Sequence, residues 1–315
     1  MEARAILFEG PKQIKLAKLE VNEMAAGDLE IDVAYTGIST GTERLLWEGS
    51  MPNFPGMGYP LVPGYEAVGQ VKKNNSNLEF KEGDFVFVPG AYSFKNVRNL
   101  FGGSGSKLIV PADRAVAIEE KNALNATLLA LAATAYHSVS KGGAINTAEP
   151  PDLIVGHGIM GRLLARMTVA AGMPPPVVWE INPARMSGAQ GYKVIDPAED
   201  TRRDYRAIYD VSGDASLLNK LITHLSPGGE VVLAGFYTEN VSFNFAAAFM
   251  KEPQIRVAAQ WKKCDLAAVS LLLSEGRLSL EGLITNTSSP AQAQDAYEDA
   301  FCDPHCLKMI LDWRN

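Results

Sequence analysis

Residues 151–172 most constrain the fold of this chain. An apolar run at 153–155 is typical of a buried parallel strand, and glycines follow at 156, 158 and 161 in the order G-x-G-x-x-G. Apolar residues then recur at helical spacing up to Ala171, and Gly172 stands where a helix commonly ends. The stretch therefore predicts a strand, a glycine turn and a helix.

Each glycine has a role in holding a dinucleotide. Gly156 permits the tight turn, Gly158 lets the backbone approach a pyrophosphate, and Gly161 lets the helix pack on the strand. The helix start then offers free N–H groups and a positive dipole end. We expect dinucleotide binding; the alternative is a glycine-rich turn without a ligand.

An acidic residue supports NAD as the dinucleotide. A second apolar run, 177–179, ends in Glu180, where a carboxylate would accept hydrogen bonds from the adenosine ribose. Glu180 would repel a 2′-phosphate, which favours NAD over NADP, although Arg185 stands five residues on and would suit such a phosphate. The expected cofactor contacts are Gly156, Gly158, Ile159, Met160, Gly161, Glu180, Ser212 and Gly235.

Composition excludes several classes of protein. The net charge of −7 without a basic run argues against a nucleic-acid partner, and no apolar segment is long enough for a transmembrane span. The three cysteines favour a reducing compartment, and the first residues lack signal-peptide architecture, so we expect a cytoplasmic protein. Cys302, His305 and Cys306 lie too close together to form a metal tetrahedron.

The order of strands and helices along the chain predicts an α/β protein with two domains, followed by a C-terminal segment that returns to the first domain. Short strands separated by turns at 1–121 suggest a barrel-like fold. Strands alternate with helices at 122–275, which predicts a doubly wound parallel sheet, and 276–315 is too short to fold alone and should return to the first domain. Expected strands include 3–8, 29–35, 207–211, 230–235, 254–259 and 307–311; expected helices are 123–140, 215–225, 265–274 and 291–301, with a turn at 226–229 and a further apolar segment at 283–285.

Three motifs in the first domain carry a family resemblance. Gly37-Ile38 followed by Thr40–Glu43 is similar to G-I-C-G-T-D with one inserted residue, Gly64–Glu66 is similar to G-H-E, and Gly83–Val86 is similar to G-D-x-V. With the domain order, they resemble the medium-chain dehydrogenase superfamily. This resemblance implies a GroES-like barrel domain followed by a Rossmann domain.

The chain departs from that superfamily at its zinc ligands. Thr40 or Ser39 stands where the superfamily has Cys, Tyr65 stands where it has His, and Ala132-Ala133 lie where the third ligand usually falls. The four-cysteine lobe is missing as well. Hydroxyl, phenol and methyl groups do not hold Zn²⁺, so the resemblance implies a zinc-free member without a catalytic metal.

A narrower resemblance points to a substrate. The stretches GISTGTERLLWEG (37–49), MPNFPGMGYPLVPGYEAVG (51–69), IVGHGIMGRLLAR (154–166) and CLKMILDWR (306–314) resemble the family of bacteriochlorophyllide a dehydrogenases. The resemblance implies oxidation of the C3 1-hydroxyethyl group of a bacteriochlorophyllide, a tetrapyrrole, to acetyl, with NAD as acceptor. Composition and spacing alone indicate no more than an NAD-dependent oxidoreductase.

Without a metal, a side chain must take or relay the proton of the alcohol. Thr42 matches the hydroxyl relay position of the superfamily, and Tyr65 and Thr40 stand at former ligand positions. His137 is a fourth candidate; Ser39, Glu43 and Glu66 are further ones. The alternatives are that Thr42 caps a helix, that Tyr65 fills the zinc void and that His137 is a core residue.

An apolar stretch rich in Gly and Pro suits a flat aromatic substrate. Met and aromatic side chains adapt well to a broad π-face, and we expect Trp47, Met51, Phe54, Met57 and Tyr59 to line one wall of the pigment site. The alternative is a hydrophobic mini-core beneath a loop.

Two other functions remain open at this point. One is a zinc-free NADPH-dependent enone or quinone reductase, and the other is a non-catalytic NAD- or pigment-binding protein. The superfamily resemblance also implies a homodimer joined at the edges of the nucleotide-domain sheets, with 241–245 or 254–259 as the edge.

Overall fold

The computed structural model describes residues 1–52, 55–140, 149–258 and 260–314. It divides into two compact units: unit 1 comprises Met1–Ala130 and Leu283–Asn315, and unit 2 comprises Leu131–Gly282. The boundaries expected after residues 121 and 275 each fall several residues before those of the units.

Unit 1 consists mainly of strands. Its strands are β1 (Glu2–Gly10), β2 (Gln13–Glu20), β3 (Asp28–Gly37), β4 (Ala67–Asn74), β5 (Phe85–Val88), β6 (Lys107–Pro111), β7 (Val116–Ala117), β14 (Asn286–Ser288) and β15 (Met309–Asp312). Its α-helices are α1 (Thr42–Glu48), α2 (Ala123–Ala126) and α8 (Ala293–Cys302). In the described part, β14-β15-β3-β4-β5-β7 form one sheet, with β6 also paired to β3, and β1 and β2 form a hairpin.

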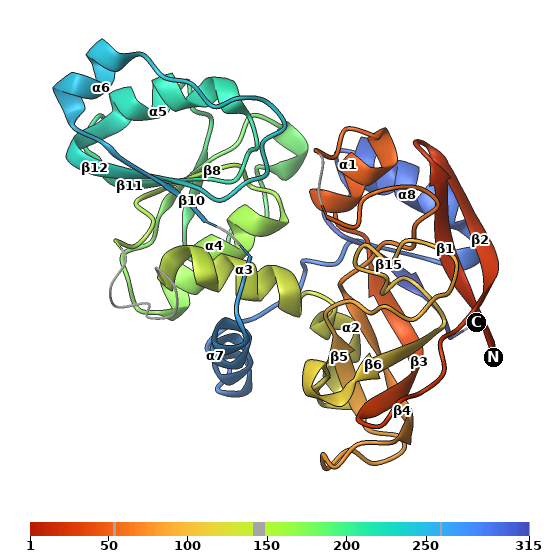
Figure 1. Cartoon of the computed structure of the whole chain (residues 1–315). Coiled ribbons are helices and arrows are strands. Elements are labelled where there is room, and N and C mark those ends of the chain that lie inside the picture. Colours follow the sequence, from red (N-terminus) through yellow and green to blue (C-terminus); the bar gives the residue numbers. More distant parts are fainter. Residues whose placement is uncertain (53–54, 141–148, 259, 315) are drawn as a thin grey trace. The chain divides into compact units, whose positions relative to one another are not determined.

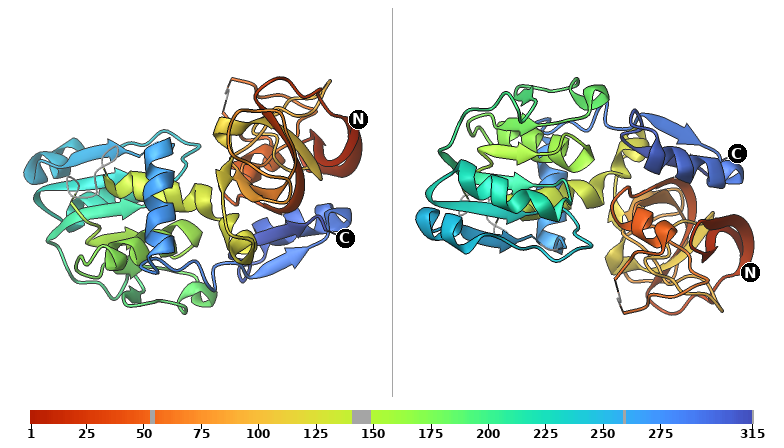
Figure 2. Two further views of the ribbon diagram at one scale, coloured as in Figure 1. Left: turned by 90° about the horizontal axis from the view of Figure 1, so that it is seen from below. Right: turned by 90° about the horizontal axis from the view of Figure 1, so that it is seen from above.

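The C-terminal segment is built into unit 1. β15 runs antiparallel to β3, with Ile310 opposite Gly37, and Figure 2 shows this segment in blue against the first strands of the same unit. Met309–Leu311 are buried on β15 because the strand lies inside the sheet. α8 adds Tyr297 and Phe301 to a core that also holds Phe8.

Unit 2 is a parallel sheet with helices on both faces. Its strands are β8 (Leu153–Val155), β9 (Val177–Trp179), β10 (Lys193–Ile195), β11 (Tyr205–Asp210), β12 (Leu225–Leu233) and β13 (Gln254–Val257). Its helices are α3 (Leu129–Ser140, which begins in unit 1), α4 (Ile159–Ala170), α5 (Leu218–His224), α6 (Phe245–Lys251) and α7 (Lys263–Ser274). Figure 1 shows α5 and α6 on one face of the sheet and α3 and α4 on the other.

The strand order of unit 2 marks a ligand position. The order is β10-β9-β8-β11-β12-β13, and all neighbours are parallel. The chain direction across the sheet therefore reverses between β8 and β11. Open α/β sheets bind ligands at the carboxyl ends of strands at such a switch point, and the glycine turn follows β8 there.

Several expected elements differ in the structure. The single helix over 123–140 is wrong: Thr127 donates its hydroxyl to Leu124 O at 2.7 Å, and the chain turns between α2 and α3. The expected turn at 226–229 lies inside β12, and the pairing register between β12 and β11 is irregular there. Residues 283–285 precede β14. Residues 241–244 form no strand, and Phe245 begins α6.

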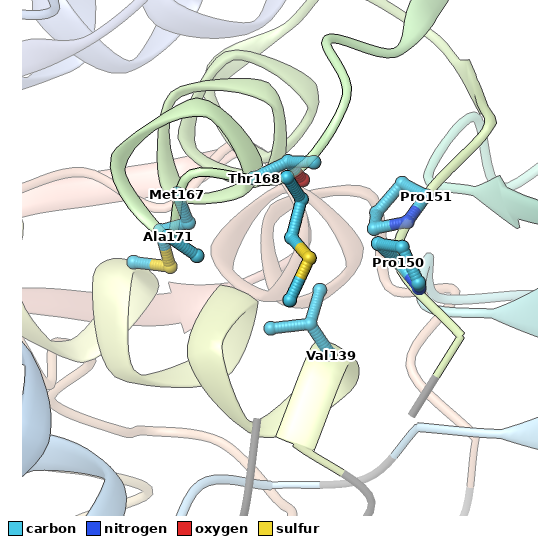
Figure 3. A pocket seen from close by; sticks show the side chains of 7 residues that line it. Val139, Pro150, Pro151, Met167, Thr168 and Ala171 are labelled. Atoms are coloured by element: carbon cyan, nitrogen blue, oxygen red, sulfur yellow. The ribbon is translucent and has the colours of Figure 1, made fainter. Parts of the chain in front are cut away.

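The cavity in Figure 3 is too small for either expected ligand. It encloses about 20 Å³ in unit 2, lined by Val139, Pro150, Pro151, Met167, Thr168, Ala171 and Met173. That is roughly the room of one water molecule. Among the described residues, no helix is both long and apolar enough to cross a bilayer.

Candidate active site and cofactor site

The glycine turn after β8 has the geometry that its sequence requires. Gly156 adopts a φ of +103°, which side chains rarely tolerate. A Cβ atom on Gly161 would lie 1.8 Å from Gly156 O, so only glycine lets α4 pack there. Gly172, with a φ of +74°, follows the end of α4 as expected.

Gly158 leaves room at the start of α4. A Cβ on Gly158 would meet nothing nearer than Nη1 of Arg185, at 4.0 Å. Ile159 and Met160 are the first residues of α4, so their N–H groups lie at the helix end that attracts anions. A pyrophosphate would therefore have both space and donors beside a guanidinium.

The carboxylate of Glu180 holds two loops in place. Its Oε2 accepts from His157 N at 2.9 Å, and its Oε1 accepts from the N–H groups of Ile181 and Asn182 at 2.8 Å each. A carboxylate offers about four acceptor positions, so one remains for a ribose hydroxyl. Glu180 thus anchors the end of β9 to the glycine turn.

His157, between the first two glycines, is a buried residue that sequence reasoning missed. Its Nδ1 lies 2.6 Å from Arg185 O, and its Nε2 lies 2.8 Å from Tyr192 Oη. Because a carbonyl only accepts, Nδ1 carries the proton and Nε2 accepts from the phenol. Burial lowers the pKa of His157 to about 4, so the ring is neutral at pH 7. Its two hydrogen bonds connect Arg185 and Tyr192 to the glycine turn. The sequence signal that could have identified His157 was its position between Gly156 and Gly158.

Ser212 and Gly235 lie at the carboxyl ends of β11 and β12. Ser212 donates its hydroxyl and its N–H to Asp210 Oδ1, at 2.6 and 2.9 Å. A Cβ on Gly235 would lie 2.9 Å from Gly213 N, so the two loops are in close contact. Both residues therefore lie just after the carboxyl ends of their strands, the edge where open α/β sheets bind ligands.

In unit 1, three hydroxyl groups form a cluster, which we call the hydroxyl cluster: Ser39, Thr42 and Tyr65. Ser39 Oγ and Tyr65 Oη are 2.5 Å apart, and Thr42 Oγ1 lies 3.5 Å from Tyr65 Oη. Ser39 Oγ also accepts from Thr42 N at 3.4 Å, so it helps to cap α1. Burial raises the pKa of the Tyr65 phenol, and the charge of Glu66 raises it further, so Tyr65 is a hydroxyl at neutral pH.

Two buried carboxyl groups flank this cluster. Glu43 Oε1 accepts from Ser39 N at 3.2 Å, and Glu43 Oε2 accepts from Tyr297 Oη at 2.6 Å. Glu66 forms a buried ion pair with Lys308, whose ammonium also donates to Ile38 O at 2.9 Å. Tyr297 and Lys308 both come from the C-terminal segment, so that segment completes the surroundings of the cluster.

His137 and Thr40 are the remaining two catalytic candidates. His137, on α3 in unit 2, places Nδ1 2.8 Å from Asp265 Oδ2, and the same oxygen accepts from Lys262 N at the start of α7. That pair connects α3 to α7, as expected for a core histidine. Thr40 lies in the turn before α1 and is partly buried.

Of the residues expected to line the pigment site, one is buried in the hydrophobic core of unit 1 and three lie at the edge of that core. Trp47 lies on α1 rather than in a loop, is 8 % exposed, and packs on Phe301 with ring centroids 5.4 Å apart. Met51, Met57 and Tyr59 are partly buried against the same core. These contacts favour the mini-core alternative, most strongly for Trp47. Phe54 lies outside the described residues.

The side-chain oxygen atoms around Tyr65 do not suit a zinc ion as ligands. Hydroxyl and phenol oxygens stand where nitrogen and sulfur ligands would be needed, and no group of three His, Cys, Asp or Glu side chains in the described part could hold a metal. Cys302 is exposed and Cys306 is buried.

The fold and its glycine turn define a nicotinamide-dependent dehydrogenase of the medium-chain type. Residues 25–120 match the alcohol dehydrogenase GroES-like domain. The fold is similar to that of an alcohol dehydrogenase of Escherichia coli CFT073 solved with NADH, at a TM-score of 0.81 and 22% identity, covering 99% of both chains.

Closer relatives define the family. The chain is 52% identical to the 2-desacetyl-2-hydroxyethyl bacteriochlorophyllide A dehydrogenases of Rhodobacter capsulatus and Cereibacter sphaeroides, covering all of this chain and 99% of each relative. The chain belongs to this dehydrogenase family, which favours oxidation of the pigment over the reductase and carrier alternatives.

Proposed function

We propose that this enzyme oxidises the C3 1-hydroxyethyl group of a bacteriochlorophyllide to an acetyl group, with NAD as the hydride acceptor. The observation that carries the proposal is the full-length identity of 52% to two hydroxyethyl bacteriochlorophyllide dehydrogenases. Together with the glycine turn, this identity supports a bacteriochlorophyllide as substrate.

The choice of NAD rests on Glu180. Its carboxylate lies at the end of β9, fixed by three backbone N–H groups, and its charge would repel a 2′-phosphate. Arg185 lies beside the glycine turn and would compensate part of that repulsion. We propose that Glu180 dominates, because the three hydrogen bonds hold it in place.

The alcohol proton is the second requirement of the reaction. NAD, when bound, accepts the hydride. We propose that Thr42 and Tyr65 position the substrate hydroxyl and relay its proton to solvent water without zinc, while the hydride goes to NAD. Their 3.5 Å contact through Tyr65 Oη supports this role, and so does the poor fit of the surrounding donors to a metal.

We further propose a homodimer joined through β13. This strand ends the sheet order in the described part, and its side chains Ile255 and Val257 are exposed. Phe245, Phe249 and Met250 on the neighbouring α6 are exposed as well. An apolar, unpaired sheet edge is a ready site for pairing with a second copy.

We place the enzyme in the cytoplasm, because its exposed thiols, Cys264 and Cys302, are free and suit a reducing compartment.

The decisive experiment is an NAD-dependent assay with 3-(1-hydroxyethyl) bacteriochlorophyllide a. The pigment absorption should shift as the acetyl group forms, in step with NADH production. Equal or faster turnover with NADP would refute the choice of NAD. Pigment binding without any absorption change on adding either nucleotide would instead identify a carrier.

A further inference from the structure

The two buried carboxyl groups beside the hydroxyl cluster differ in their partners. Glu66 is paired with the ammonium of Lys308. Within the described residues, the donors to Glu43 are neutral: the Ser39 N–H and the Tyr297 phenol. When two neighbouring acids have such different environments, they take on different roles.

Glu43 is directly linked to the cluster through Ser39. Its Oε1 accepts from Ser39 N, and Ser39 O in turn accepts from Glu43 N at 3.1 Å. The same serine carries the hydroxyl that lies 2.5 Å from Tyr65 Oη. The carboxyl group of Glu43 is therefore connected to Tyr65 through a single residue, Ser39.

The groups that face Glu43 come from three other elements. Tyr297 lies on α8, Glu66 and Tyr65 lie just before β4, and Lys308 lies just before β15. Burial raises the pKa of Glu43 to about 7, while the Tyr297 hydrogen bond opposes this rise. Glu43 thus changes charge near neutral pH.

We propose that Glu43 is a positioning residue whose charge state controls how firmly Ser39, and through it Tyr65, is held for the dehydrogenase reaction. This inference rests on the proposed function of the hydroxyl cluster.

The ionised form of Glu43 is the one that suits both of its donors. A carboxylate accepts from Ser39 N and from Tyr297 Oη at once, and such charge-assisted bonds are about twice as strong as neutral ones. When Glu43 is protonated, one of its oxygens becomes a donor and competes with one of these bonds. The cluster should then loosen as the pH falls.

The test is the pH profile of kcat/KM for pigment oxidation in the wild type, Glu43→Gln and Tyr297→Phe. The wild type should lose activity as the pH falls through about 7. Glu43→Gln should lose this limb and be about tenfold slower at high pH, with unchanged NAD affinity. Tyr297→Phe should move the limb to higher pH, because it removes a bond that favours the carboxylate.

Glu48→Gln is the matched control. Glu48 lies on the same helix, is paired with Arg44 at 2.9 Å near the surface, and should keep the wild-type profile. If Glu43→Gln loses kcat/KM as the pH falls through about 7, as the wild type does, the proposal is overturned. If Glu43→Gln does not fold, the pH profile of Tyr297→Phe decides. The proposal is overturned if Tyr297→Phe loses activity at the same pH as the wild type.

A second readout does not depend on the substrate. The tyrosine ultraviolet spectrum of the wild type minus that of Tyr65→Phe should change between about pH 6 and pH 8, and Glu43→Gln should abolish the change. If the pigment is not oxidised at all, the proposed function fails, while this spectrum still tests the link from Glu43 to Tyr65. A spectrum that is constant with pH would overturn the link.

Discussion

A Cβ atom on Gly161 would lie 1.8 Å from the carbonyl oxygen of Gly156, whereas one on Gly158 would meet no atom beyond its chain neighbours nearer than Nη1 of Arg185, at 4.0 Å. Gly158 also has an ordinary backbone φ of −73°. The first contact is a requirement of the fold, and the second position is free for a ligand. The two glycines should therefore respond differently to substitution.

Gly158→Val should fold normally and lose NAD binding, because the branched side chain would occupy the pyrophosphate space. We expect the Kd for NADH to rise by at least about tenfold in calorimetry, with little change in Tm. Gly161→Ala is the contrasting variant and should impair folding. Wild-type NADH affinity in Gly158→Val would mean that the turn is structural alone.

Catalysis should not depend on zinc, because hydroxyl groups surround Tyr65. Elemental analysis of protein purified without chelators should show far less than one zinc per chain, and chelators should leave turnover unchanged. One tightly bound zinc per chain would contradict this prediction.

Trp47→Ala should lower stability rather than pigment affinity, because Trp47 packs in the core against Phe301. Truncating a buried tryptophan costs about 3–5 kcal/mol of unfolding free energy, measurable by denaturant titration. Trp47→Phe should cost far less, since the buried indole N–H has no hydrogen-bond partner among the described residues. A stable Trp47→Ala with a raised KM for the pigment would restore Trp47 to the pigment site.

The stability of the wild type relative to Glu43→Gln should fall as the pH rises from about 4.5 through about 7. The pKa of Glu43 is raised by burial from 4.5 to about 7 in the folded protein, so the folded state binds the proton more tightly. This contribution is complete below the unfolded value and lost above the folded one, a change of about 3 kcal/mol. Urea titrations across this range would measure it, with Glu48→Gln as the control; parallel curves for the wild type and Glu43→Gln would refute it.

Val257→Lys should convert the proposed dimer into monomers, because it places a charge on the edge of β13, where Val257 is 72% exposed. Light scattering after gel filtration would show the change in mass. Tyr92→Lys, at an exposed position of unit 1, should leave the dimer intact. A wild-type monomer would exclude the proposed edge pairing.

The geometry of the glycine turn in unit 2 was largely predictable because its constraints are local. The φ of +103° at Gly156 and the close approach of Gly161 are steric conditions that the residues themselves satisfy. Glu180 at the end of β9 follows from the spacing of two apolar runs, because parallel strands end at one edge of the sheet. His157 stood within the same motif, yet its partners Arg185 O and Tyr192 Oη depend on how a later loop folds back.

The sequence by itself therefore determined the glycine turn, the change from short strands to alternating strands and helices, and the presence of Thr40 and Tyr65 rather than Cys and His, since each depends on residue types that are close together in the sequence. The tertiary structure alone decided that Trp47 belongs to the core and that Glu43 meets Tyr297, 254 residues away. It also decided that Lys308 neutralises Glu66 rather than Glu43. The physical reason is that burial and charge pairing depend on which distant segments pack together, and local spacing does not encode that choice.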